Sequence, residues 1–161
     1  MGTHYHGAED ERLALETLTK LFRAADSVSA RVHAHLAAAP LSPSQFGILE
    51  ALLHLGPLHQ CELSQKLLKS SGNITVVVDH LEHSGLVERR RDCADRRLIT
   101  IHLTAAGRRR IKGLFPRHAK QVLEALGALS QAEQRMLGQL CKKLGLANSS
   151  KAVSRTAQVQ R

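Results

Sequence analysis

Aromatic side chains are scarce in this chain of 161 residues. Only 2% of the residues are aromatic, namely three Phe, one Tyr and no Trp. Hydrophobic residues still make up 43% of the chain, so a core has to be built mainly of Leu, Val, Ile and Ala. This composition favours packed helices over a β-sandwich, and the length suffices for one domain with a core. A module that stacks RNA bases on aromatic rings is disfavoured for the same reason.

Cysteine pairs and long apolar runs are also lacking. Cys61, Cys93 and Cys141 lie far apart and are odd in number, which excludes a disulfide framework and a zinc finger. No apolar run reaches 18 residues, and the polar N-terminus does not resemble a secretory leader. We therefore expect a cytoplasmic protein with free thiols and no membrane contact. Motifs such as a Gly-rich phosphate loop or H-E-x-x-H are absent, so we expect neither an enzyme nor a cofactor.

Positive charge, in contrast, is abundant and unevenly placed. The formal net charge is +9, from 23 Lys and Arg against 14 Asp and Glu. Between Leu86 and Lys112, nine basic residues outnumber three acidic ones, so one short stretch contributes +6. Such a concentration is either a solvated surface or the electrostatic footprint of a nucleic-acid-binding face. Double-stranded DNA is the partner that we expect.

The residues before this basic stretch predict a helix that could read DNA. The β-branched run at 74–78 would favour a strand. Its apolar residues nevertheless recur at the helical spacing i, i+3, i+4 and i+7: Ile74, Val77, Val78 and Leu81. The opposite face carries small, hydrogen-bonding and apolar groups, which suit base edges in a major groove. A half-buried packing helix is the alternative. The candidate base contacts are Ser70, Ser71, Asn73, Thr75, Val76 and His80.

A β-hairpin is expected to follow this helix. Residues 86–89 and 98–103 have strand-like patterns, and the second alternates apolar and polar residues. The strand ends and the loop between them hold the densest cluster of guanidinium groups in the chain. Guanidinium groups on such a hairpin would contact phosphates or the minor groove. The candidates are Arg89, Arg90, Arg91, Arg96 and Arg97.

The order of these motifs resembles a known family. G-L-V-x-R at 85–89, D-x-R at 95–97 and L-T-x-x-G at 103–107 are similar to the multiple-antibiotic-resistance regulators, the MarR family of winged helix-turn-helix repressors. The resemblance covers about residues 9–146. It implies a mainly α fold with a small β-hairpin wing, and a recognition helix from Ser71 to His83. It also implies that Asp95 orients Arg97 into the minor groove.

The resemblance further implies a domain organisation. We expect residues 1–161 to form a single chain of this type, in which helices at 9–39 and 105–146 form a homodimer. Residues 40–104 would form the DNA-binding lobe, and residues 1–8 and 147–161 disordered tails. Local signals agree with these limits: a capping box begins a helix at Ser42, a short edge strand follows at 58–60, and Pro116 should kink or break the later helix.

The signal that controls such a regulator is less defined. By analogy with the family, a small phenolic or anionic ligand would bind in a cleft lined by Phe46, Phe115 and His118. Cys93 offers an alternative, because neighbouring arginines favour a thiolate that could be oxidised. A metal site is not expected: His33 and His35 are two residues apart and do not share a helical face, although His118 could approach one of them in a dimer.

The function predicted from the sequence is therefore regulation of transcription. A symmetric dimer would place two recognition helices in successive major grooves, about 34 Å apart, on a pseudo-palindromic operator. Repression released by the ligand is the expected mode. An RNA- or protein-binding winged helix is the alternative, and the intact D-x-R motif argues against loss of DNA contact.

Overall fold

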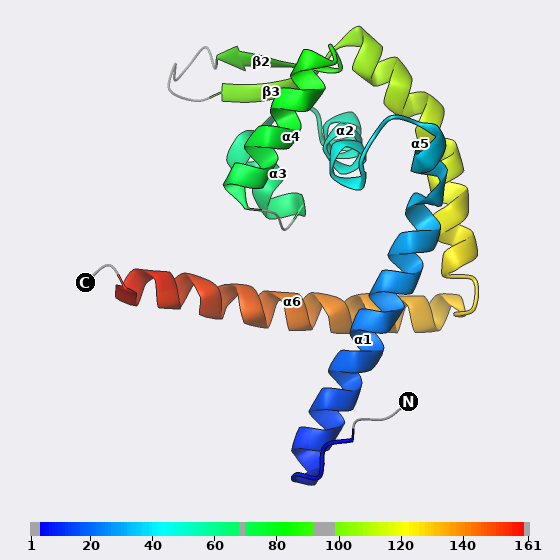
Figure 1. Ribbon diagram of the computed structural model, residues 1–161, viewed down its shortest axis with the longest axis vertical. Coiled ribbons are helices and arrows are strands. Elements are labelled where there is room, and N and C mark those ends of the chain that lie inside the picture. Colours follow the sequence, from blue (N-terminus) through cyan, green and yellow to red (C-terminus); the bar gives the residue numbers. More distant parts are fainter. Residues whose placement is uncertain (1–3, 68–69, 92–98, 160–161) are drawn as a thin grey trace. The chain divides into compact units, whose positions relative to one another are not determined.

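In a computed structural model, the chain is described for residues 4–67, 70–91 and 99–159 (Figure 1). The helices are α1 (Glu9–His33), the 3-10 helix η1 (Ala34–Ala38), α2 (Pro43–Leu55), α3 (Gln60–Leu67), α4 (Ser71–His83), α5 (Ala105–Ala125) and α6 (Gln131–Val159). The strands are β1 (Leu58–His59), β2 (Val87–Arg91) and β3 (Ile99–Leu103). The chain divides into two compact units, Met1–Val122 and Leu123–Arg161.

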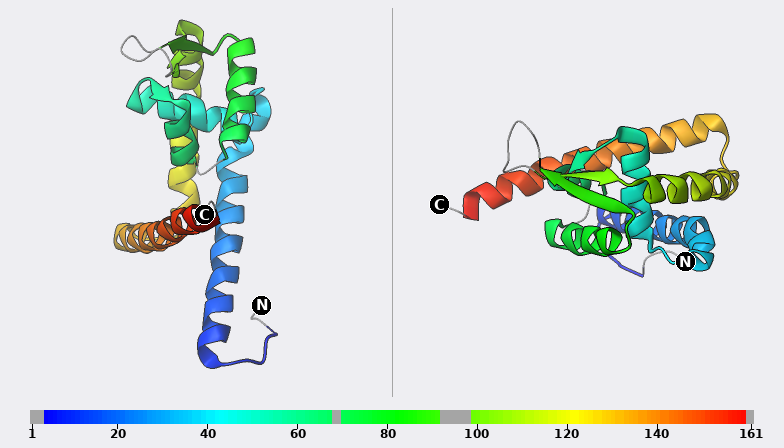
Figure 2. Two further views of the ribbon diagram at one scale, coloured as in Figure 1. Left: turned by 90° about the vertical axis from the view of Figure 1, so that its left-hand side faces the viewer. Right: turned by 90° about the horizontal axis from the view of Figure 1, so that it is seen from above.

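The first unit contains a winged helix-turn-helix, as predicted. Helices α2, α3 and α4 pack on one another, and α4 contacts β2 (Figures 1 and 2). The antiparallel sheet has the order β1-β3-β2, so the predicted edge strand pairs with β3. Ile101 lies at the centre of this sheet, where it is opposite Leu58 on one side and Arg89 on the other. The fold class predicted from the sequence is confirmed.

The core of this unit is aliphatic, as the shortage of aromatic residues required. The side chains that are at most 2% exposed come from all the elements of the lobe except β1: Phe46, Ile48, Leu49, Leu52, Leu63, Ile74, Val78, Leu81, Val87, Ile101 and Ile111. Three of the four apolar residues that predicted the α4 helix are among them. Helical periodicity therefore identified the buried face of α4 in spite of the β-branched run.

Several helix ends also match the sequence signals. The hydroxyl of Ser42 accepts a hydrogen bond from the backbone N–H of Gln45, whose amide oxygen accepts one from the N–H of Ser42. Ser70 caps α4 by accepting a hydrogen bond from the N–H of Asn73. After α4, Gly85 adopts φ 68°, a left-handed conformation that costs glycine little and ends the helix.

Three boundaries differ from the predictions. The first long helix ends at His33, and the one turn of 3-10 helix that follows carries the chain to the predicted stop before Pro40. α5 continues through Pro116 without a break, at the cost of one backbone hydrogen bond. α6 extends to Val159, so the predicted disorder of residues 147–161 is wrong where they are described. A glycine such as Gly145 costs only about 1 kcal/mol inside a helix, and no proline follows it.

A compact joint connects α4, β2 and α5. The hydroxyl of Thr104 donates to the carbonyl of Gly85 (2.7 Å) and accepts from the N–H of Gly107 (3.0 Å), which caps α5. A Cβ at Gly107 would lie 1.9 Å from the carbonyl oxygen of Leu86, so only glycine fits there. The G-L-V and L-T-x-x-G motifs thus meet in space and fix the chain on both sides of the hairpin.

Gly107→Ala should destabilise the protein because its methyl group collides with the Leu86 carbonyl. We expect the free energy of unfolding to fall by about 1–3 kcal/mol, measured by urea denaturation. Gly113→Ala, on the same helix with open space around its Cβ, is the matched control. Its free energy of unfolding should rise by about 0.5–1 kcal/mol. Equal stabilities of the two variants would contradict the close contact at Gly107.

Candidate nucleic-acid interface

The outward face of α4 is exposed and carries one acidic residue, Asp79, whose side chain is 55% exposed and pairs with Arg89. Gly72, Asn73, Val76 and His80 are all exposed, and Val76 leaves 54% of its surface open although it is apolar. The face therefore presents an amide, an imidazole and an aliphatic group side by side. Amide groups bind adenine edges, and aliphatic groups contact thymine methyls in a major groove. The structure brings these predicted contact residues together on one accessible surface.

Thr75 and Ser70 have structural partners of their own. Thr75 is half-buried, and its hydroxyl accepts a hydrogen bond from the amide of Gln60 on α3. Thr75 therefore links the two helices of the helix-turn-helix, and its predicted contact with DNA stays a prediction. Ser70 is exposed at the N-cap and keeps its hydroxyl proton for another acceptor. The side chain of Ser71 lies outside the described part of the structure.

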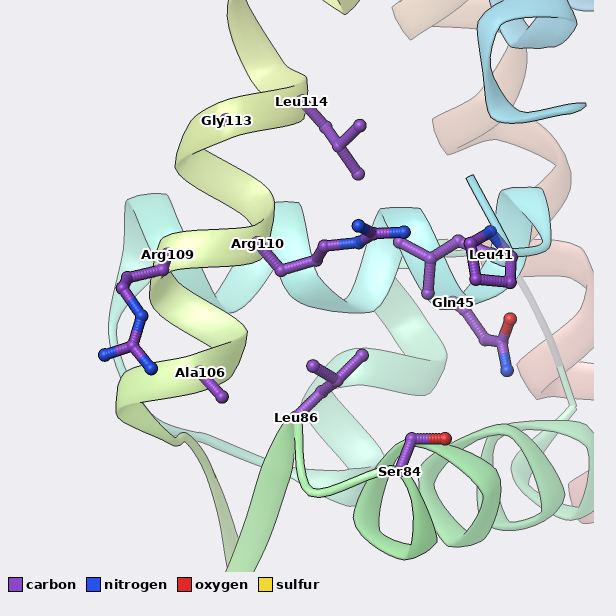
Figure 3. Close-up of a pocket in the computed structure, with 10 residues that line it drawn as sticks. Leu41, Gln45, Ser84, Leu86, Ala106, Arg109, Arg110, Gly113 and Leu114 are labelled. Carbon is purple, nitrogen blue, oxygen red and sulfur yellow. The ribbon is translucent and has the colours of Figure 1, made fainter. Parts of the chain in front are cut away.

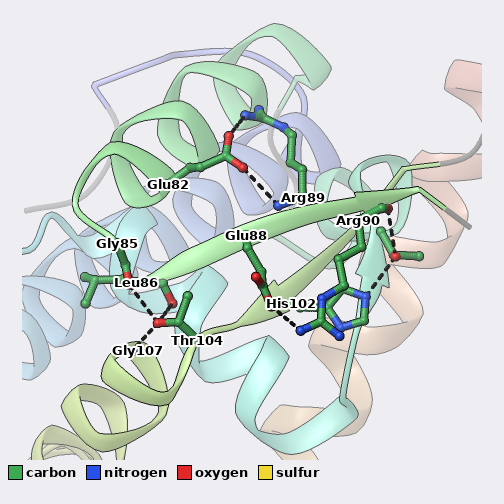
Figure 4. A network of polar contacts seen from close by, with 10 residues as sticks. Glu82, Gly85, Leu86, Glu88, Arg89, Arg90, His102, Thr104 and Gly107 are labelled. Carbon is green, nitrogen blue, oxygen red and sulfur yellow. Dashed lines mark hydrogen bonds and ion pairs between the residues drawn. The ribbon is translucent and has the colours of Figure 1, made fainter.

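Arg89 occupies a different place from the one we predicted. Its guanidinium bridges two carboxylates of α4, with Nη2 at 2.6 Å from Asp79 and Nη1 bound to Glu82, and its side chain is only 24% exposed. Its backbone N–H also donates to Glu82 (2.9 Å). Figure 4 shows the contacts of Arg89 with Glu82. Arg89 thus ties strand β2 to α4, and its guanidinium is not available to DNA while this arrangement holds.

Arg89, Asp79 and Glu82 form what we call the Arg89 clamp, and their electrostatics favour the charged form of Arg89. Burial lowers the pKa of Arg89, but its hydrogen bonds with Asp79 and Glu82 and their negative charges outweigh burial and leave the pKa raised. Sequence reasoning missed both carboxylates. Their i, i+3 spacing, which places them on one helical face beside the start of the hairpin, was the available signal.

Arg90 and Arg91 remain in the positions expected of a wing. Arg90 is 61% exposed and, among the described residues, forms an ion pair with Glu88 on the same strand. Arg91 is exposed at the end of β2. Asp95, Arg96 and Arg97 lie outside the described residues, and so does Cys93. The roles predicted for these four residues therefore stay predictions. Cys61 and Cys141 are free thiols, as predicted.

A cavity of about 410 Å³ lies between α1, α2 and α5 in the first unit. Phe46 and His118, two of the three predicted ligand-binding residues, line it, and their rings are 4.5 Å apart. Glu50 and His33 contribute the other ionisable groups. Phe115 does not line this cavity, because its ring packs on His54 at 4.6 Å. We therefore leave Phe115 out of the candidate ligand site.

Three histidines gather at one end of this cavity within a single chain. The ring of His118 lies 5.3 Å from that of His35 and 6.1 Å from that of His33. His35 donates from Nδ1 to the carbonyl of Val32 (2.9 Å), since a carbonyl can only accept. Burial, with the nearby imidazoles of His35 and His33, lowers the pKa of His118. Sequence reasoning had allowed such an approach only across a dimer and had not seen the role of His35.

Two further findings concern metals and membranes. Within the described ranges, no group of three or more His, Cys, Asp or Glu side chains is arranged to hold a metal ion. Among the helices over residues 4–67, 70–91 and 99–159, none is long and apolar enough to cross a membrane.

Arg89→Ala should loosen the wing, because Asp79 and Glu82 would then lie together without a counter-ion. We expect the free energy of unfolding to fall by about 1–2 kcal/mol, a range that allows for solvent screening of the partly exposed carboxylates. Arg90→Ala, the matched control, breaks only an exposed pair and should cost less than about 1 kcal/mol. If the two variants unfolded at the same urea concentration, Arg89 would not be a clamp.

His118 should make stability depend on pH. Because its pKa is lower in the folded than in the unfolded state, its contribution is complete above about pH 6.5 and is lost as the pH falls below that value. We expect the free energy of unfolding to decline less between pH 7.5 and 5.5 in His118→Phe, which keeps an aromatic ring against Phe46. Identical declines in the wild type and this variant would show that His118 is not the group responsible.

Comparisons with known proteins agree with this geometry. The model of the MarR family matches residues 41–99. The HTH-type transcriptional regulator MhqR of Bacillus subtilis is 33% identical over 133 residues, which cover 83% of this chain and 92% of MhqR. A solved MarR family protein from Bacillus stearothermophilus is 29% identical, with a TM-score of 0.66 over 88% of this chain and 99% of that protein.

A third protein shares the fold at lower identity. Bordetella bronchiseptica BpsR is 24% identical, with a TM-score of 0.74 over 89% of this chain and 98% of its own. The winged helix-turn-helix architecture is therefore common to these three proteins and to this chain. Together with the exposed face of α4 and the family match over the DNA-binding lobe, these likenesses identify the protein. The chain belongs to the MarR family of winged helix-turn-helix transcriptional regulators, which bind DNA and are not enzymes.

Proposed function

We propose that this regulator is a homodimeric cytoplasmic repressor that binds a pseudo-palindromic operator and is released by a small phenolic ligand. The observation that carries the proposal is the outward face of α4. Val76, an exposed apolar residue between Asn73 and His80, is not needed for packing in the lobe. Its side chain could contact the methyl group of thymine. Arg90 and Arg91 lie on the strand that follows and supply charge for the phosphates.

Unpaired apolar faces support the homodimer. α1 exposes a stripe of large apolar residues at helical spacing: Leu15, Leu18 and Phe22. α6 in the second unit exposes another: Met136, Leu137, Leu140 and Leu144. Neither stripe is covered within the described chain, and amphipathic helices of this length bury such faces against a partner. A second copy of the chain provides two equal stripes, so a two-fold dimer is the simplest way to cover them.

The cavity between α1, α2 and α5 favours a phenol over a carboxylate. Its volume of about 410 Å³ suits a single substituted ring, and Val32, Phe46 and Leu67 are apolar residues of its wall. A neutral His118 can accept a hydrogen bond from a hydroxyl group. The carboxylate of Glu50 would repel a carboxylate ligand but can also accept from a hydroxyl. BpsR, which has the same fold, is regulated in its DNA binding by 6-hydroxynicotinic acid, whose ring carries both a hydroxyl group and a carboxylate. This supports a small hydroxylated ring as the ligand, and the preference against a carboxylate rests on Glu50 alone.

DNase footprinting with the purified protein on the DNA upstream of its own reading frame tests the function. We expect two protected half-sites about one helical turn apart, related as an inverted repeat. Affinity should fall by on the order of 10³–10⁵-fold between 50 and 200 mM salt if the dimer neutralises about 6–10 phosphates. Phenol derivatives should release the DNA at lower concentrations than the corresponding benzoates.

Two variants separate base reading from phosphate contact. Asn73→Ala should lose about 1–3 kcal/mol on the operator but little on unrelated DNA, because it removes a base contact. Arg90→Ala should weaken binding to every sequence and reduce the salt slope by about 1. A uniform loss in Asn73→Ala would contradict base reading by α4, and release by benzoates alone would contradict the phenolic ligand.

A further inference from the structure

A second and larger cavity lies in the first unit, away from the histidine cluster. It has a volume of about 880 Å³ and opens between the start of α2, the turn from α4 to β2 and the first half of α5 (Figure 3). Arg109 and Arg110 are its charged residues, and no Asp or Glu is among the described residues that line it. The cavity therefore has positive charge without a counter-ion built into its wall.

The two arginines are not equivalent. Arg110 extends from α5 across the cavity, and its guanidinium lies beside Leu41, whereas Arg109 points to the other side of the helix (Figure 3). Neither forms an ion pair in the described part of the chain, in contrast to Arg89 and Arg90. An arginine held over a concave surface with its donors unused is suited to a carboxylate or a similar planar anion.

Gln45 adds a second donor to this cavity. Its amide oxygen is occupied by the N–H of Ser42 at 2.7 Å, so the amide NH₂ is the group left for a ligand. The other walls are apolar: Leu41 is 8% exposed, and Leu86 and Leu114 are half-buried. A charged end at Arg110 and an apolar body against these leucines would together fill the space.

We propose that this cavity is a binding site for a small organic anion, a carboxylate or sulfonate carried on a ring or a short aliphatic chain. The site is distinct from the cavity at His118, where Glu50 disfavours an anion. It goes beyond the proposed function and does not depend on it. Leu86 also belongs to the joint with Thr104 and Gly107, so a bound anion contacts the point where α4, β2 and α5 meet.

Isothermal titration of the full-length protein with 2-naphthoate tests the site directly. We expect Arg110→Gln to bind 2-naphthoate about 10- to 100-fold more weakly, the loss of one charge-assisted hydrogen bond. Arg108→Gln removes the same charge from α5 at a residue that does not line the cavity, and this variant should bind as the wild type does. Uncharged 2-naphthalenemethanol and inorganic phosphate, which each lack one half of the ligand, should bind at least about tenfold more weakly than 2-naphthoate.

A second pair of variants fills the cavity without touching its charge. Gly113 lines the cavity, and its Cβ position is open. Gly113→Leu should block 2-naphthoate, while Gly113→Ala should not. Equal affinity in the wild type and Arg110→Gln, or equal losses in Arg108→Gln and Arg110→Gln, would overturn the proposal. So would a loss of operator binding in Arg110→Gln with unchanged 2-naphthoate affinity, because Arg110 would then be a phosphate contact.

Discussion

The ion pairs of Arg89 with Asp79 and Glu82 hold the DNA-facing surface together. A two-stranded hairpin is marginally stable by itself, and here its first strand is fixed to the helix that precedes it. The guanidinium binds both carboxylates of α4, and the backbone N–H of Arg89 adds a third contact. Because β2 carries Arg90 and Arg91, the clamp also sets where these exposed arginines lie relative to the outward face of α4. The ion pairs of Arg89 thus fix the strand that carries Arg90 and Arg91, the two arginines proposed to contact DNA.

The joint at the base of the hairpin complements this clamp from the other end. Gly85 turns the chain out of α4, Thr104 starts α5, and Gly107 lets the Leu86 carbonyl approach α5 closely. Two of the three motifs that resemble the MarR family, G-L-V-x-R and L-T-x-x-G, therefore serve the architecture of the wing. In the proposed function, DNA contact depends on other residues, namely the exposed side chains of α4 and the exposed Arg90 and Arg91 of β2. Leu86 belongs both to this joint and to the wall of the proposed anion site. A ligand bound in that site would therefore contact a residue that fixes the base of the hairpin.

Local signals predicted the elements well, because each rests on interactions within a few residues. The helical spacing of Ile74, Val78 and Leu81 outweighed the strand preference of a β-branched run, and the capping box at Ser42 marked a helix start. Tertiary partners could not be predicted in this way. Arg89 was assigned to DNA because a sequence shows a guanidinium but not the carboxylates it will meet. The approach of His35 to His118, more than 80 residues away, likewise depends on how α1 packs against α5.

The proposed function rests on the exposed face of α4, which would read base edges in the major groove. Chemical interference on the operator tests this most directly. Methylation of guanine N7 and replacement of thymine by deoxyuridine alter only the major groove, so binding should be blocked at positions clustered in two half-sites one helical turn apart. If modification of the major groove had no effect, while blocking of minor-groove or phosphate positions abolished binding, α4 would not be the element that reads the sequence, and recognition through its outward face would be contradicted.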